Sequence, residues 1–300
     1  MFFDPATNTA FGNLGWVDHG SVWSWDAAAA RERRITIPGA AFVSVRPHAE
    51  SLLRLIHHGE EAVASIRACA DPEAELTRVR SGPGGWRFEG DSALWGDPLA
   101  LLMRSASGRT ELLLVDGPAG TIRSLDLSWY NDENYDRGYQ GLVDCLALPG
   151  HGLVVVSIQR SSELIVIDPD RSAAVASISL AGSGGNPVLR LWSDTEFLAN
   201  DYDSLCLVDR VSLTARCSGV LQPAAPPNTN QFTGDYDFRG STCVVARPFS
   251  GDVLRLRIED FAVIGRAPVA GQPLSVCMIS DQSFLTRDWQ TGRLETGEFN

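Results

Sequence analysis

Short runs of aliphatic and β-branched residues recur along the chain, and several of them end in an acidic residue. Three examples are Glu111–Asp116, Glu163–Asp168 and Ser204–Asp209, with the sequences ELLLVD, ELIVID and SLCLVD. Such runs, bounded by polar turn residues, are typical of β-strands. Few segments place apolar residues at the 3.6-residue spacing of a helix over ten or more positions. The pattern therefore predicts a chain that is almost entirely β.

The runs belong to an internal repeat. Six copies begin at spacings of 40 to 60 residues, at Ser51, Glu111, Glu163, Ser204, Asp252 and Gly292. Most copies are preceded by another β-rich run, such as Leu153–Ile158, and followed by a further one, such as Ala174–Leu180. Units of four short strands over roughly 40–50 residues are typical of propeller blades.

The repeat predicts an all-β fold, a single β-propeller domain over residues 1–300. Six blades of four antiparallel strands account for about residues 32–300, and the last blade lacks a fourth strand. The N-terminal segment, about residues 1–31, contains Ser21–Trp25, which we expect to complete the last blade and close the ring, so that no edge stays open. Residues 82–95 lie within the longest spacing and could form an extra half-blade, so seven blades are the alternative.

In this organisation the chain resembles the β-propellers of the YVTN/NHL-like and gluconolactonase-like groups. Its blades end in Val-Asp or Ile-Asp and not in the Trp-Asp of WD40 repeats. It lacks the Glu-Gly-Pro opening of the gluconolactonase kind, so the metal ligands of that group have no matching residues here. The resemblance implies a fold, and a fold does not by itself imply an activity.

Composition narrows the classes of function. The net charge of −12 argues against a nucleic-acid backbone as the main partner. All 25 basic residues are arginine, which excludes mechanisms that need a lysine Schiff base or a P-loop lysine. No apolar run approaches the length of a membrane helix and the N-terminus shows no secretory signal. We therefore expect a cytoplasmic protein that binds neither nucleic acid nor membrane.

The six cysteines are scattered and form no C-x-x-C motif. Zinc sites and redox dithiols usually have closer spacing, so neither is indicated. Cys206 and Cys217 could face each other across a hairpin. In a reducing compartment, however, we expect the cysteines to be small apolar thiols packed in the sheets.

Candidate functional residues lie in turns. In a propeller, the loops that join the second strand to the third, and each blade to the next, meet on one face around the central funnel, where function tends to lie. Several of these loops place acidic residues beside aromatic ones. The candidate ligand-binding residues are Asp132, Glu133, Tyr135, Asp136, Asn186, Asp201, Tyr202, Asp203, Asp235, Tyr236, Asp288 and Trp289. The structural alternative is that these residues only form turns and satisfy backbone groups there.

Carboxylates beside Tyr and Trp suit a divalent cation such as Ca²⁺, an organic cation or a sugar. The candidate metal ligands are Asp136, Asp201 and Asp235, while no residue is assigned a catalytic role. Because an acidic surface attracts positive partners, we expect a binding protein whose acidic, aromatic funnel face captures a small ligand, a cation or a basic protein segment. The alternative is a metal-assisted or carboxylate-based enzyme of the lactonase, lyase or cyclase type, with its active site in the same funnel.

Overall fold

A computed structural model of the chain gives its architecture. The structure describes residues 1–13, 21–37, 40, 42–48, 51–58, 61–71, 75–80, 87–88, 99–105, 107, 109–116, 121–128, 142–148, 150–182, 184–223 and 232–299. Within these ranges there are 27 β-strands, in line with the predicted all-β class. No helix in these ranges is long and apolar enough to cross a membrane.

The strands form antiparallel sheets, numbered here in chain order, and each sheet consists of consecutive strands. Sheet 1 contains β1 (Phe2–Asp4), β2 (Thr9–Asn13), β3 (Ser21–Asp26) and β4 (Arg31–Thr36). Sheet 2 contains β5 (Phe42–His48), β6 (Ser51–His58), β7 (Glu61–Ala68) and β8 (Glu75–Arg80). Sheet 3 contains β9 (Arg87–Phe88), β10 (Leu99–Arg104), β11 (Thr110–Asp116) and β12 (Thr121–Asp126). Sheet 4 contains β13 (Leu142–Leu148), β14 (Leu153–Ile158), β15 (Glu163–Asp168) and β16 (Ala173–Ser179).

The C-terminal half continues the same meander. Sheet 5 contains β17 (Leu189–Leu191), β18 (Glu196–Asp201), β19 (Ser204–Asp209) and β20 (Ala215–Cys217). Sheet 6 contains β21 (Tyr236–Arg239), β22 (Thr242–Arg247), β23 (Asp252–Arg257) and β24 (Val263–Pro268). Sheet 7 contains only β25 (Pro273–Met278), β26 (Ser283–Asp288) and β27 (Leu294–Glu298). Polar turns such as Asp209–Leu213 separate the strands and let each one pair with its predecessor.

The described strands form seven sheets, one more than the six blades that the repeat favoured and equal to the alternative number. The N-terminal strand Ser21–Asp26 does not complete the last sheet, because it pairs with β2 and β4 in a sheet of its own. The first strand of that sheet, β1, has only three residues, too few to show an alternating pattern. In addition, the run at Ser51 is the second strand of its sheet, whereas the other five runs lie in third strands. Because the run at Ser51 occupies a different strand of its sheet from the other runs, the count of runs was one short of the number of sheets.

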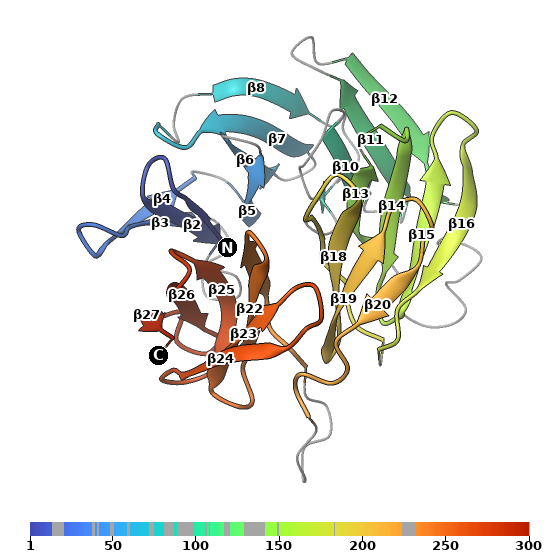
Figure 1. The fold of residues 1–300 in the computed structure, drawn as a ribbon. Coiled ribbons are helices and arrows are strands. Elements are labelled where there is room, and N and C mark those ends of the chain that lie inside the picture. The colour runs from blue at the N-terminus through green and yellow to red at the C-terminus, as the bar shows by residue number, and fades with distance from the viewer. Residues whose placement is uncertain are drawn as a thin grey trace.

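Neighbouring sheets pack face to face around a common centre (Figure 1). Buried Leu146 and Val166 of sheet 4 pack with Phe197 of sheet 5 in one apolar cluster. Sheet 1 packs in the same way on sheet 7, where Trp23 and Leu285 belong to another cluster. Because both faces of these strands are covered, their sequences read as nearly continuous apolar runs. The clusters between sheets therefore form the core.

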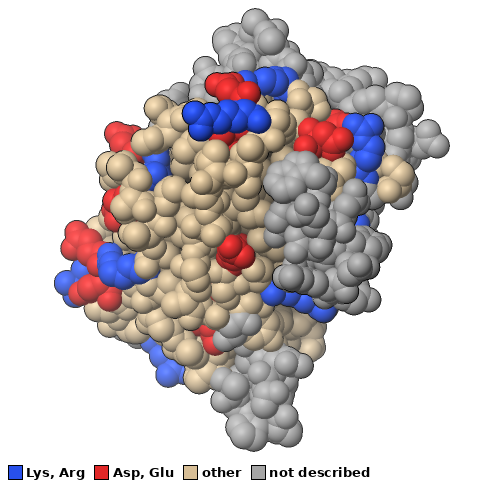
Figure 2. Space-filling model, turned by 90° about the vertical axis from the view of Figure 1, so that its right-hand side faces the viewer, with Lys and Arg blue, Asp and Glu red and all other residues tan. Residues whose placement is uncertain are grey.

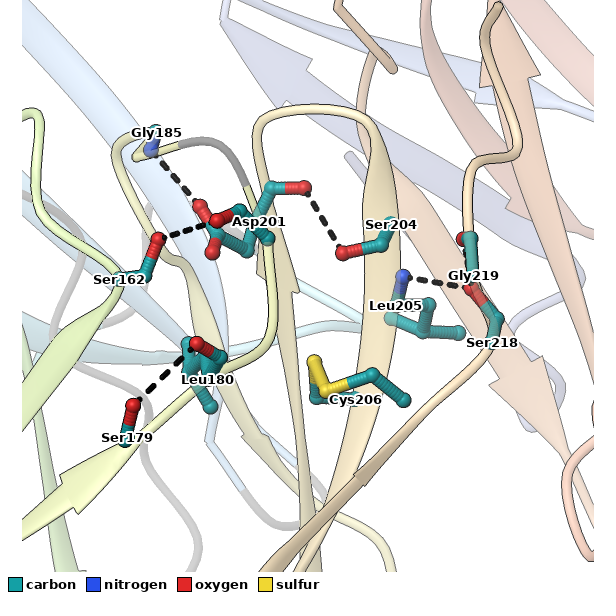
Figure 3. The surroundings of a disulfide bond; sticks show 12 residues. Ser162, Ser179, Leu180, Gly185, Asp201, Ser204, Leu205, Cys206, Ser218 and Gly219 are labelled. Carbon is teal, nitrogen blue, oxygen red and sulfur yellow. Dashed lines mark hydrogen bonds between the residues drawn. A yellow bond between two sulfur atoms is a disulfide. The ribbon is translucent and has the colours of Figure 1, made fainter.

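A disulfide joins Cys206 on β19 to Cys217 on β20, which are partners across the two strands (Figure 3). This corrects the expectation that these two cysteines are packed thiols. Their Cα atoms lie 4.0 Å apart, because an antiparallel pair sets the facing side chains close together. The other four, Cys69, Cys145, Cys243 and Cys277, are buried thiols as expected.

Removing the disulfide should destabilise the protein. We expect the double substitution Cys206→Ala and Cys217→Ala to lower the free energy of unfolding by about 2–4 kcal/mol, because the bond restricts the unfolded chain. Urea denaturation with and without a reductant measures this loss. The wild type should lose stability in the reductant while the double variant should not respond. A wild-type midpoint that ignores the reductant would contradict the prediction.

Candidate functional site

A pocket of about 790 Å³ opens where turns and inter-sheet connections of sheets 4 to 6 meet. The described residues that line it are Arg160, Gly184, Gly185, Asn186, Asn200, Tyr202, Phe232 and Thr233. Arg160 lies between the second and third strands of sheet 4, and Tyr202 holds the same place in sheet 5. Asn200 lies near the end of β18, and the other lining residues lie in the connections from sheet 4 to 5 and from sheet 5 to 6. In sheets 4 to 6 these two kinds of loop therefore meet at one pocket, and its volume suits a small molecule.

Two asparagines supply hydrogen-bond donors to this pocket. The side-chain oxygen of Asn186 accepts a hydrogen bond from the Arg160 N–H at 3.3 Å, and that of Asn200 accepts one from the Val188 N–H at 2.7 Å. Each amide thus uses its oxygen on the backbone. Among the described residues neither NH₂ group donates to the protein, so both can donate to a ligand.

Asp201 is fully buried, and Figure 3 shows it beside Gly185, a residue of the pocket lining. Its Oδ1 accepts a hydrogen bond from the Gly185 N–H at 2.7 Å. The Ser162 hydroxyl donates to the Gly182 carbonyl of the same loop at 2.9 Å. A Cβ on Gly182 would lie 2.3 Å from Oδ2 of Asp201, and one on Gly185 would lie 2.3 Å from the Tyr202 nitrogen. The two glycines therefore allow the loop to press against the β18–β19 turn, and Asp201 holds it there.

Four half-buried rings, here called the aromatic row, extend from the pocket towards sheet 7. The Phe232 ring lies 6.0 Å from Tyr202, 5.1 Å from Phe249 and 5.5 Å from Trp289, measured between centroids. Tyr202, Phe249 and Trp289 occupy equivalent turns of sheets 5, 6 and 7. Tilted and edge-to-face pairs of this kind add about 0.5–1.5 kcal/mol each. The sequence predicted that Tyr202 and Trp289 lie on one face, but it missed Phe249. Phe249 occupies the same turn of its own repeat, and that position could have identified it.

Asp235 and Tyr236 lie in a buried charge network rather than in the pocket. Arg190 on β17 donates to Asp235 at 2.9 Å and lies 3.4 Å from an oxygen of Asp237. Its guanidinium carbon lies 4.9 Å from the centroid of the Tyr236 ring. Asp235 also accepts a hydrogen bond from the amino group of Met1 at 3.0 Å. The Arg190 guanidinium and the Met1 amino group therefore balance the charge of Asp235, which the sequence had suggested as a ligand-binding residue.

Burial sets the protonation behaviour of this network. It raises the pKa of Tyr236 well above its ordinary value. It also raises the pKa of Asp237, although the Arg190 guanidinium acts in the opposite direction. The Tyr236 hydroxyl lies 3.0 Å from the carbonyl oxygens of both Val188 and Leu198. The neutral phenol thus ties sheet 6 to sheet 5, which is a structural role.

The Asp288 carboxylate stabilises the turn that follows it by accepting hydrogen bonds. It accepts them from the backbone and hydroxyl of Thr291, at 2.7 and 2.6 Å, and from the Gln272 N–H at 2.6 Å. Burial alone would raise the pKa of Asp288, but these hydrogen bonds outweigh it and hold the pKa below its ordinary value. In sheet 5, Asp203 likewise lies in the β18–β19 turn, where its carbonyl accepts a hydrogen bond from Leu221.

The lowered pKa of Asp288 predicts a pH-dependent stability. A depressed carboxyl pKa stabilises the fold above the unfolded value of about 3.9, and this contribution disappears as the pH falls through the folded value. We expect the difference in unfolding free energy between wild type and Asp288→Asn to shrink from pH 6 towards pH 3. Chemical denaturation over this range measures it. A difference that stays constant would show that the carboxylate does not stabilise the turn through its charge.

The remaining candidates do not form one cage with these residues. Asp132, Glu133, Tyr135 and Asp136 lie outside the described residues. Within the described part of the chain, no three His, Cys, Asp or Glu side chains are grouped to hold a metal ion. Asp201 instead binds the Gly185 N–H in the pocket wall, and Asp235 binds Arg190 in the charge network. The structure brings Asn186, Tyr202 and Trp289 to one face and directs the carboxylates of Asp201, Asp235 and Asp288 to internal partners.

Charged side chains do not gather into one acidic patch on the face shown in Figure 2. Acidic and basic groups are scattered there, often side by side, with wide uncharged areas between them. Ion pairs on the surface of the described residues include Arg109 with Glu111 at 2.6 Å and Arg123 with Asp170. Exposed pairs of this kind contribute about 0–1 kcal/mol.

Comparison with known proteins gives the fold. No family model and no curated protein matches the chain. Among solved structures, the Cps50 (Swd1) β-propeller domain of Myceliophteria thermophila is 11% identical with a TM-score of 0.64, over 99% of this chain and 95% of that one. The RRP9 WD40 repeats are 11% identical with a TM-score of 0.66, over 99% and 93%. AztD from Citrobacter koseri is 12% identical with a TM-score of 0.50, over 97% and 98%. The chain is therefore a β-propeller, as its resemblance to propeller groups predicted.

Proposed function

We propose that this propeller is a binding protein and that its ligand occupies the pocket between sheets 4, 5 and 6. The observation that carries the proposal is that unused hydrogen-bond donors and aromatic rings line the same pocket. The NH₂ groups of Asn186 and Asn200 and the rings of Tyr202 and Phe232 line the same space. Rigid sheets hold these turns in place, which is the usual arrangement of a binding site on a stable scaffold.

The lining favours a ligand that combines a ring with acceptor oxygens. A ring can pack on Tyr202 and Phe232, while oxygens accept hydrogen bonds from the two amides. None of the described lining residues is acidic. This pocket therefore suits a different ligand from the cation or basic segment that the acidic composition favoured. The described lining also holds no histidine or carboxylate for acid–base catalysis, so binding is the function we propose.

We also propose that the seven sheets are the blades of one closed domain over residues 1–300. The support is the packing of the first sheet on the last, in which Met1, Trp23 and Trp25 share an apolar cluster with Cys277 and Leu285. A closed ring would hold the pocket turns of sheets 4 to 6 rigidly, since each sheet is then packed on both faces.

The proposed pocket can be tested with 3-phenylpropionate and its uncharged amide, 3-phenylpropionamide, as probes. Both combine a ring with acceptor oxygen, and saturation-transfer NMR or calorimetry measures their binding. We expect Tyr202→Ala and Asn186→Ala each to weaken binding by about tenfold or more. The matched control is Trp192→Ala, which removes a ring at the opposite end of sheet 5, where its indole N–H donates to Gly240. Wild-type protein that binds neither probe, or variants that bind both equally well, would contradict the proposal.

A further inference from the structure

Sheet 7 lacks the outer strand that every other described sheet has. Six sheets contain four strands each, and in all of them a fourth strand pairs with the third. Sheet 7 ends at its third strand, β27 (Leu294–Glu298). Within the described residues no strand pairs with the outer side of β27. In the other six sheets a fourth strand binds the backbone groups at the corresponding edge.

The register shows which groups face this open edge. The Phe299 N–H donates to the Gln282 carbonyl of the preceding turn, which places the odd-numbered positions of β27 in hydrogen-bonded pairs with β26. Because antiparallel strands alternate the direction of their backbone groups, the even-numbered residues point the other way. Leu294, Thr296 and Glu298 therefore direct their N–H and C=O groups outward. These are the groups that a fourth strand would bind.

The open position lies between two neighbouring sheets. Figure 1 shows β27 (red) between the first sheet (blue) and β24 of sheet 6 (orange). Leu294 packs against the cluster that contains Trp25 of sheet 1, and β24 lies beside β27 on the other side. A strand added to β27 would therefore lie near β24 of sheet 6 and near the first sheet.

The complete sheets indicate the chemistry of the missing strand. In two of the complete sheets, an arginine of the outer strand lies beside an aspartate of the third strand: Arg31 on β4 is the register partner of Asp26, and Arg266 on β24 bonds to Asp252. β27 is acidic as well, with Glu295 and Glu298 among its five residues. The chain as a whole carries a net charge of −12, which attracts basic segments. The acidic side chains of β27 and the outward backbone groups of its edge thus both favour an extended, basic segment.

We propose that β27 binds an extended, arginine- or lysine-bearing segment of a partner protein, which adds to sheet 7 as an antiparallel fourth strand. Main-chain hydrogen bonds to Leu294, Thr296 and Glu298 supply the affinity of such strand addition, and side-chain pairing selects the partner. Basic side chains of the segment pair first with the exposed Glu298, because the Glu295 carboxylate already accepts a hydrogen bond from the Ala270 N–H. This surface lies on the outer edge of the fold and is independent of the pocket.

The test uses the peptide acetyl-Thr-Arg-Val-Arg-Val-Thr-Arg-amide and the same peptide N-methylated at its three central residues. Both carry the same charge, but the N-methylated form cannot donate hydrogen bonds along its centre. Hydrogen exchange followed by NMR should show the amides of Leu294, Thr296 and Glu298 slowing by about tenfold or more with the first peptide and not with the second. No slowing at saturating peptide, or equal binding of both peptides, would overturn strand addition.

A proline variant gives a second readout. Thr296→Pro removes one outward N–H without breaking a bond to β26, because proline is tolerated at strand edges. We expect it to weaken binding of the unmodified peptide by about tenfold or more. The matched control is Ser177→Pro, at an exposed, outward position of β16 in the complete sheet 4. If both variants bind alike, β27 is not the site. If Thr296→Pro does not fold, the comparison of the two peptides on the wild type decides.

Discussion

Replacement of Arg190 by methionine is expected to lower the free energy of unfolding by about 3–5 kcal/mol. Arg190 is only 8% exposed and is bonded to Asp235 and Asp237. Methionine fills much of the same volume but removes the guanidinium from both carboxylates, of which Asp235 still keeps the Met1 amino group. Burial already raises the pKa of Asp237, although the Arg190 guanidinium and the Met278 N–H stabilise its charged form, so loss of the guanidinium removes one of these stabilising groups. Urea denaturation at neutral pH measures the loss.

Two further variants separate loss of the buried charge from loss of an arginine in general. Arg171→Met removes an exposed partner of Asp168, with 77% of the arginine side chain accessible, and should cost at most about 1 kcal/mol. Adding Asp237→Asn to Arg190→Met should restore part of the stability, because one unpaired charge is then removed. A loss below about 1 kcal/mol for Arg190→Met would show that the charge network does not stabilise the fold.

The second large effect is expected at the pocket wall, for Gly185→Ala. The added Cβ would lie 2.3 Å from the backbone nitrogen of Tyr202, so the loop must move away from the β18–β19 turn. This movement would also strain the hydrogen bond from Gly185 to Asp201. We expect binding of 3-phenylpropionate to weaken by about tenfold or more, and stability to fall by about 1–3 kcal/mol. Calorimetry and urea denaturation measure the two quantities.

The matched control for this glycine is Gly150→Ala. Gly150 lies in the β13–β14 turn, at the end of sheet 4 away from the pocket, with a φ of 77°, and a Cβ added there would meet no atom within 4 Å. Its substitution should cost about 1–2 kcal/mol through backbone strain alone and leave binding unchanged. Gly185→Ala with wild-type affinity would mean that the loop position does not shape the site.

Much of the fold could be predicted from the sequence because the third strands are apolar on both faces. Glu163–Asp168 and Ser204–Asp209 are covered by neighbouring sheets on each side, and this leaves a continuous apolar run that is easy to recognise. The first sheet was missed for the opposite reason. Its strand β1 has three residues, and β4 reads RERRIT with an exposed, charged surface. Outer strands of this kind resemble turns in the sequence.

The site could be predicted only in part, because the direction of a side chain depends on contacts between distant residues. The turns that carry Tyr202 and Trp289 occupy equivalent places in their sheets, so their common face followed from the repeat. The sequence does not reveal that Asp201 turns inward to Gly185, or that Asp235 pairs with Arg190, 45 positions away. Local composition therefore overestimated the acidity of the pocket.

The most direct test of the binding site is an NMR titration of asparagine-labelled protein with 3-phenylpropionate. The proposed pocket places the NH₂ groups of Asn186 and Asn200 against the ligand, whereas Asn8 lies in a turn of sheet 1. We predict that the side-chain resonances of Asn186 and Asn200 shift as the ligand is added while that of Asn8 stays in place. Unchanged resonances of both pocket asparagines at saturating ligand would contradict the proposed site.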